Sequence, residues 1–116
     1  MKKFKLLTVL AISLFILSGC TKASKSSFPI PGSTKNQSEQ NGTTNFQTSK
    51  SLEEVLSFYH TELKAMGLTE RTLNTAVTET TFSIVYDGHE NGKAIVVQGV
   101  KLDEKSTNVN IRFEDI

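Results

Sequence analysis

The period of the apolar residues changes once along this chain, from about 3.6 to 2, and this change constrains the fold more than any other feature. From Leu52 to Met66, apolar residues recur every three or four positions, which predicts an amphipathic helix. Ser51 and Glu54 have the spacing of a capping box, so the helix should begin at Ser51. Gly67 then supplies a C-terminal stop.

Beyond the helix, the alternation of apolar and polar side chains predicts three strands. Residues 82–86 are β-branched and aromatic and alternate between the two faces of a sheet. Turn signals at 87–92 join them to a second strand at 93–102, in which Gly99 indicates a bulge. A turn at 103–106 leads to a last strand. Its inward side chains are expected to be Val109, Ile111 and Phe113.

Two further segments have weaker strand patterns. Residues 69–78 suit an irregular edge strand, and residues 43–48 around Phe46 suit another strand before the helix. The prediction is an α+β fold over residues 45–116: one amphipathic helix packed on an antiparallel sheet of three to five strands, preceded by a flexible tether. The chain has a single cysteine, Cys20, so no intramolecular disulfide can form and stability depends on an apolar core.

The first nineteen residues have the composition of an export signal. Lys2, Lys3 and Lys5 precede an almost continuously apolar run from Leu6 to Leu17. That run is roughly a dozen residues long, whereas a transmembrane helix needs about 20, so we expect residues 1–19 to be removed. The remaining chain would carry ten basic and twelve acidic residues, a net charge of about −2 that argues against nucleic acid as a partner.

The end of this signal has a specific pattern: Leu17, two small residues, Ser18 and Gly19, and then Cys20. It resembles the lipobox of bacterial lipoproteins. The resemblance implies that the Cys20 thiol is linked to diacylglycerol and that cleavage falls between Gly19 and Cys20. Further acylation, by palmitate or a similar chain, makes such an anchor durable, because one chain alone binds a bilayer only marginally. The protein is then expected on the extracytoplasmic face of the cell membrane.

Residues 20–44 are expected to form the lipidated terminus and a polar tether, because they are rich in Ser, Thr, Lys, Asn, Gln and Gly. About 23 flexible residues would reach roughly 25 Å. Phe28-Pro-Ile-Pro-Gly32 is an exception within this segment. Phe28 and Ile30 either pack onto the edge of the domain, or the segment serves as a stiff spacer.

Several of these features occur together in a known kind of protein. The Pro-Xaa-Pro-Gly segment, the Ser-capped helix with Phe58, Tyr59 and Leu63, the Gly stop and the hairpins resemble small α+β domains of uncharacterised envelope lipoproteins. The resemblance spans about 28–116 and implies no activity.

The residues that commonly carry catalysis or bind metals are sparse. His60 is expected on the helix surface, and His89 lies in a polar turn beside Asp87 and Glu90, a looser set than zinc requires. The adjacent acids at 53–54 diverge by about 100° on a helix and already suit its first turn. No phosphate-binding loop or nucleophile motif is present. We therefore expect no catalytic residues, no metal, no cofactor and no enzyme activity.

Phe58 and Tyr59 are adjacent, so both cannot easily face one core. Tyr59 fits the apolar stripe, and Phe58 either packs against the sheet edge or contacts a partner. The sequence thus predicts a membrane-anchored, noncatalytic interaction module of the cell envelope, in which the face or the edge of the sheet docks an envelope protein or a cell-wall component. The alternative is a small-ligand binder with a pocket between helix and sheet, although a domain this small seldom encloses about 300 Å³.

Overall fold

The computed structural model describes residues 28–116. The predicted signal peptide, Cys20 and the first part of the predicted tether lie outside the described residues. Within residues 28–116, no helix has both the length and the hydropathy needed to cross a membrane.

Helix α2 (Leu52–Ala65) begins as the sequence predicts. The Ser51 side chain accepts a hydrogen bond from the backbone N–H of Glu54 at 3.2 Å, and a Glu54 carboxylate oxygen accepts one from the backbone N–H of Ser51 at 2.9 Å. These hydrogen bonds lower the pKa of Glu54. The helix stops before Gly67, whose φ of 85° is in the left-handed region that glycine adopts readily. The capping box and the stop are both confirmed.

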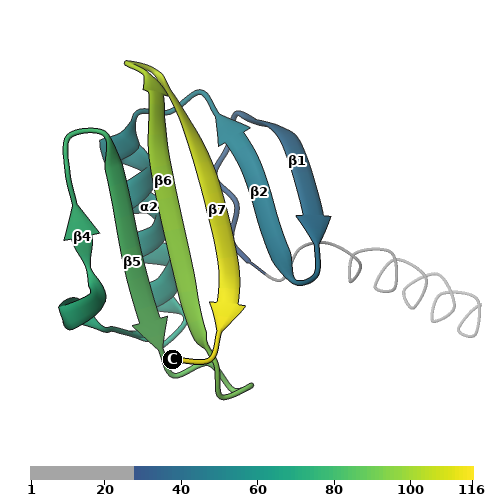
Figure 1. Cartoon of the computed structure of the whole chain (residues 1–116), viewed down its shortest axis with the longest axis vertical. Helices are drawn as coiled ribbons and strands as arrows, with labels where there is room; N and C mark the ends of the chain where they lie inside the picture. Colours follow the sequence, from purple (N-terminus) through teal and green to yellow (C-terminus); the bar gives the residue numbers. More distant parts are fainter. Residues whose placement is uncertain (1–27) are drawn as a thin grey trace, which may run out of the picture.

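One antiparallel sheet of seven strands lies against α2 (Figure 1). Its strand order is β1-β2-β7-β6-β5-β3, and the short strand β4 also pairs with β5. The expectation of three to five strands is therefore wrong. The strands are β1 (Thr34–Gln40), β2 (Thr43–Thr48), β3 (Thr69–Glu70), β4 (Ala76–Val77), β5 (Thr81–Asp87), β6 (Ala94–Asp103) and β7 (Ser106–Glu114).

The extra strands come from the two ends of the sheet. Strand β1 forms from residues 34–40, so the prediction that this segment belongs to the flexible tether is also wrong. An Asn41-Gly42 turn joins β1 to β2, with φ values of 55° and 80°, as a two-residue hairpin turn requires. At the other end, residues 69–78 form two short strands separated by a 3₁₀ turn at Thr72–Asn74.

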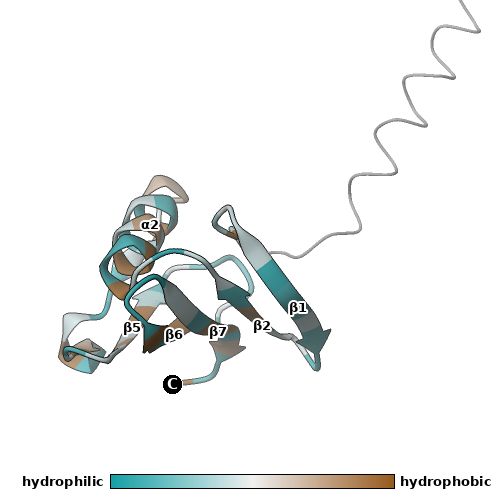
Figure 2. Ribbon diagram, turned by 90° about the horizontal axis from the view of Figure 1, so that it is seen from above, coloured by the Kyte–Doolittle hydropathy of each residue, from teal (hydrophilic) through white to brown (hydrophobic). Residues whose placement is uncertain are grey.

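The core lies between α2 and the sheet, where the apolar residues of the helix meet those of the strands (Figure 2). Phe28 belongs to this core, with 6% of its surface exposed and its ring centroid 4.9 Å from that of Phe113. The Tyr59 hydroxyl donates a hydrogen bond to the Pro29 carbonyl at 2.9 Å, and burial raises the pKa of Tyr59. Of the two interpretations of this segment, packing onto the domain is therefore confirmed.

Strand β6 contains Gly99, but the pairing register runs without interruption through this residue. The irregularity between β6 and β7 falls between Lys101 and Asp103 instead, so the expected bulge at Gly99 is wrong. Gly99 pairs with Phe82 of β5, and a Cβ atom placed on Gly99 would overlap the Phe82 ring. The glycine is needed for close packing and not for a bend.

Candidate functional site

The space between α2 and the sheet is filled by side chains. Tyr59, Val55 and Leu63 of the helix are fully buried, as are Ile95 and Ile111 of the strands that face them. A ligand between helix and sheet would have to displace these close-packed groups, which is costly. The helix side of the sheet therefore serves as the structural core, and the other face is the one open to a ligand or partner.

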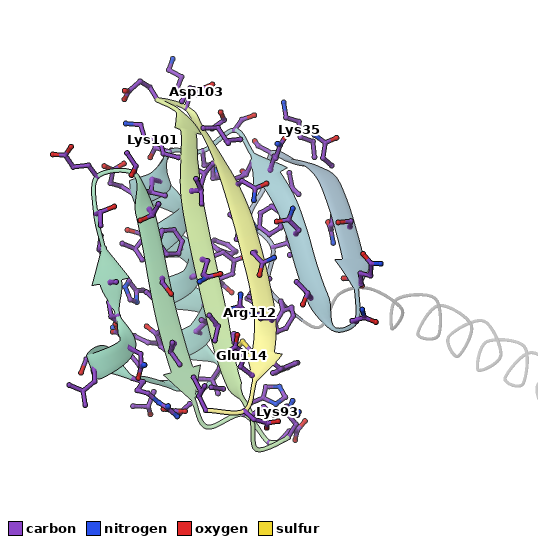
Figure 3. All side chains as sticks on the ribbon, viewed as in Figure 1. Lys35, Lys93, Lys101, Asp103, Arg112 and Glu114 are labelled. Carbon is purple, nitrogen blue, oxygen red and sulfur yellow. The ribbon has the colours of Figure 1, made fainter. Side chains whose placement is uncertain are left out.

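The opposite face of the sheet has no helix over it among residues 28–116 and is turned toward the viewer in Figure 3. Strand pairing brings side chains from different strands into rows across this face. One complete row runs from β4 to β1 and consists of Ala76, Ser83, Gln98, Asn110, Asn45 and Ser38. We call the surface that contains this row the helix-free face.

An apolar patch lies on the helix-free face over one end of β5 and β6. Val85, Ala94 and Val96 form a second buried cluster there. Val100, on the same face of β6, is about half exposed. Val96 pairs directly with Arg112 of β7, so the apolar part ends where the charged and amide side chains begin.

The part over β7, β2 and β1 is rich in amide side chains, and hydrogen bonds orient several of them. Arg112, labelled in Figure 3, donates from Nη1 to Gln98 Oε1 and to Asn110 Oδ1, both at 2.9 Å. Asn108 Nδ2 donates to Asn45 Oδ1 at 3.1 Å. In both Asn45 and Asn110 the carbonyl oxygen is engaged and the Nδ2 group has no partner within residues 28–116.

A hollow of about 440 Å³ lies in this amide-rich part. Its lining residues share one property, because all carry uncharged polar side chains: Ser38, Gln40, Asn41, Thr43, Asn45 and Asn110. We call it the amide hollow. Its volume falls in the range of about 300–1,000 Å³ that small-molecule sites occupy. The residues come from three strands and one turn, so only the tertiary structure brings them together.

The family model described as START domain-like matches residues 23–99, which is well over half of the chain and includes α2 and the strands from β1 to β5. The chain belongs to the START domain-like family. No curated protein matches it.

A polar cluster lies at the β3 edge of this START domain-like chain. The Tyr86 hydroxyl and His60 Nδ1 are 2.6 Å apart, and Glu70 Oε1 lies 3.9 Å from the same nitrogen. Thr75 donates to Glu70 at 2.6 Å. Desolvation and the Glu70 charge raise the pKa of Tyr86, which keeps the phenol protonated and unsuited to nucleophilic attack. The cluster joins α2 to the sheet edge, and His60 is less exposed than the sequence suggested.

In the START domain-like structure, the side chains around the turn at His89 contact other groups. Asp87 accepts two hydrogen bonds from Arg71, at 2.6 and 2.8 Å, and these hold the pKa of Asp87 below its usual value. The His89 ring packs edge-on against Phe113 with centroids 4.8 Å apart. Among residues 28–116, no group of three or more His, Cys, Asp or Glu side chains is placed to hold a metal ion.

Phe58, the residue predicted as either a packing or a partner contact, is half-buried. Its ring packs edge-on against Tyr59 at a centroid distance of 5.0 Å and adjoins the core. The rest of its surface borders a shallow hollow of about 430 Å³ beside Lys50, Glu53, Glu54 and Ser57. The START domain-like fold therefore packs part of Phe58 and leaves part of it exposed, and contact with a partner stays a prediction.

Proposed function

We propose that this chain is a lipid-anchored, noncatalytic binding domain on the extracytoplasmic face of the cell membrane. The binding role rests on one structural observation: the sheet presents a face with no helix over it among residues 28–116, and this face is rich in polar side chains over β7, β2 and β1. Membership of the START domain-like family supports a binding role over a catalytic one. The filled core argues against the alternative of a pocket between helix and sheet and favours the face of the sheet.

The anchoring role rests on the lipobox at residues 17–20. If Cys20 carries the lipid, the burial of Phe28 fixes where the domain begins, and residues 21–27 alone connect the two. Eight chain steps span at most about 29 Å when fully extended. The domain would therefore work close to the membrane, on a connection much shorter than the tether of about 23 residues expected from composition.

The anchor is tested by Cys20→Ser in cells that express the full chain. We expect wild-type protein in the membrane fraction, with the mass of a diacylglyceryl group on its N-terminal cysteine. The variant should lose both the acyl mass and membrane retention, because serine cannot form the thioether. Ser26→Ala, in the same segment but outside the lipobox, is the matched control and should behave as wild type. A wild-type protein without acyl mass would disprove the anchor.

The binding role is tested by a photoreactive side chain at position 98 on the helix-free face, in intact cells. Gln98 is exposed, and so is Thr61 on α2, which provides a matched position on the other side of the molecule. We expect a specific adduct, to an envelope protein or to a cell-wall component, from position 98 and not from position 61. Equal adducts from both positions, or none from position 98, would contradict binding by this face.

A further inference from the structure

The amide hollow has a composition that limits what it can bind. None of its six lining side chains is ionisable, so it offers no counter-charge to an anion or a cation. Arg112, the nearest cation in the strand pairing, is engaged by Gln98, Asn110 and Glu114. An apolar ligand would remove water from these polar groups without replacing their hydrogen bonds, which is unfavourable. The chemistry that remains is a neutral ligand rich in hydrogen-bonding groups.

Most of the lining groups are available to such a ligand. Within residues 28–116, the side chains of Ser38, Gln40, Asn41 and Thr43 have no hydrogen-bond partner. Asn45 and Asn110 are held by their carbonyl oxygens, so their Nδ2 donors are oriented without being used. The hollow thus combines two pre-oriented donors with four side chains that can each donate and accept.

We propose that the amide hollow binds a neutral carbohydrate. Sugar hydroxyls both donate and accept hydrogen bonds, as the hollow's own groups do, and they carry no charge. Neighbouring strands are about 4.8 Å apart, and successive residues on one face are about 6.6 Å apart, so the contacts form a shallow grid suited to an extended chain of rings. This inference rests on the proposed binding function and names its ligand class. A free oligosaccharide and a cell-wall glycan share this chemistry.

Two isosteric variants isolate the unused donors. Asn45→Asp keeps the oxygen that accepts from Asn108, and Asn110→Asp keeps the oxygen that accepts from Arg112. Each replaces the Nδ2 donor with an oxygen acceptor and adds a negative charge shared by the two carboxylate oxygens. Asn74→Asp, exposed in the 3₁₀ turn away from the hollow, is the matched control. We expect each hollow variant to weaken binding at least about tenfold and the control to leave it unchanged.

The experiment uses the full lipidated chain in nanodiscs and observes side-chain amide signals by NMR. The soluble neutral probes are maltotetraose and an N-acetylglucosamine tetramer, the polymeric probe is isolated cell-wall sacculi in a sedimentation assay, and a galacturonic acid tetramer is the charged control. Binding of a soluble neutral probe that shifts the Asn45 and Asn110 signals supports the proposal with a free oligosaccharide as ligand. If only sacculi bind, and both Asp variants lose this binding, the proposal is supported with a wall glycan as the ligand.

The proposal is overturned if no neutral probe binds at millimolar concentration, if the charged tetramer binds equally well, or if both Asp variants bind as wild type does. The signal shifts on the wild-type protein report the site even if a variant folds poorly. The mass of the same sample shows whether the anchor is present. If a correctly acylated protein binds no sugar, only the carbohydrate proposal is contradicted. If the acyl group is missing, only the anchoring proposal is contradicted.

Discussion

Replacing Phe46 with alanine should destabilise the domain by about 3–5 kcal/mol, the cost typical of removing a fully buried phenylalanine. Phe46 lies on β2 with 0% of its surface exposed, and it packs in the core with Tyr59 and Ile111. A loss of this size approaches the total stability of many small domains, about 5–15 kcal/mol. We expect a large drop in melting temperature, or a population already unfolded at room temperature, measured by circular dichroism.

Phe58→Ala is the matched control, because it removes the same side chain from a half-buried position. Its cost should be roughly 1–2 kcal/mol, in proportion to the smaller apolar area that is lost. The difference between the two losses of stability shows whether β2 and its hairpin partner β1 belong to the folding unit. Equal and small effects at both positions would show that the N-terminal hairpin contributes little to the core.

Gly99→Ala should destabilise the domain by about 1–3 kcal/mol, a typical cost of overpacking. The three atoms nearest to an added Cβ all belong to the Phe82 ring, and Phe82 is itself only 2% exposed, so the ring has little room to move. Gly99 lies on a central strand, between β5 and β7. Urea denaturation, with the free energies of unfolding compared, measures the effect.

Gly32→Ala controls for the general effect of replacing a glycine. An added Cβ at Gly32 meets no atom within 4 Å, and its φ is outside the left-handed region, so the change should be neutral or slightly stabilising. Adding Phe82→Leu to Gly99→Ala should recover part of the loss, because the two side chains share one space. If Gly99→Ala is as stable as Gly32→Ala, the close packing described above does not limit this position.

The strands in which apolar and polar side chains alternate strongly were predictable, and strand β1, which has no such alternation, was not. The helix with its capping box and the hairpin from β5 to β6 follow from period, caps and turn residues that act over a few positions. Strand β1 has almost no buried side chain, so no apolar alternation identifies it. The Asn41-Gly42 turn was the available signal, because that dipeptide favours a two-residue hairpin.

The candidate site was harder to predict from the sequence than the fold was. Asn45 and Asn110 are far apart in the sequence, and each has the ordinary appearance of a solvent-facing strand residue. Their pairing across β2 and β7 places them side by side, and Arg112 and Asn108 then orient their amides. His60 is similar, because its contact with Tyr86 depends on how α2 crosses β5. Phe58 is half-buried, a degree of exposure that its sequence position beside Tyr59 did not determine.

The sequence alone determined the features that depend on neighbouring residues: the capped helix, the alternating strands and the turns between them. Only the tertiary structure decided that a polar segment completes a seven-stranded sheet, that Gly99 accommodates an aromatic ring, and that six uncharged side chains line one hollow. The physical reason is that backbone hydrogen bonds between strands do not depend on apolar side chains. A polar strand can therefore join a sheet, and bring its side chains to a shared face, without any periodic signal of its own.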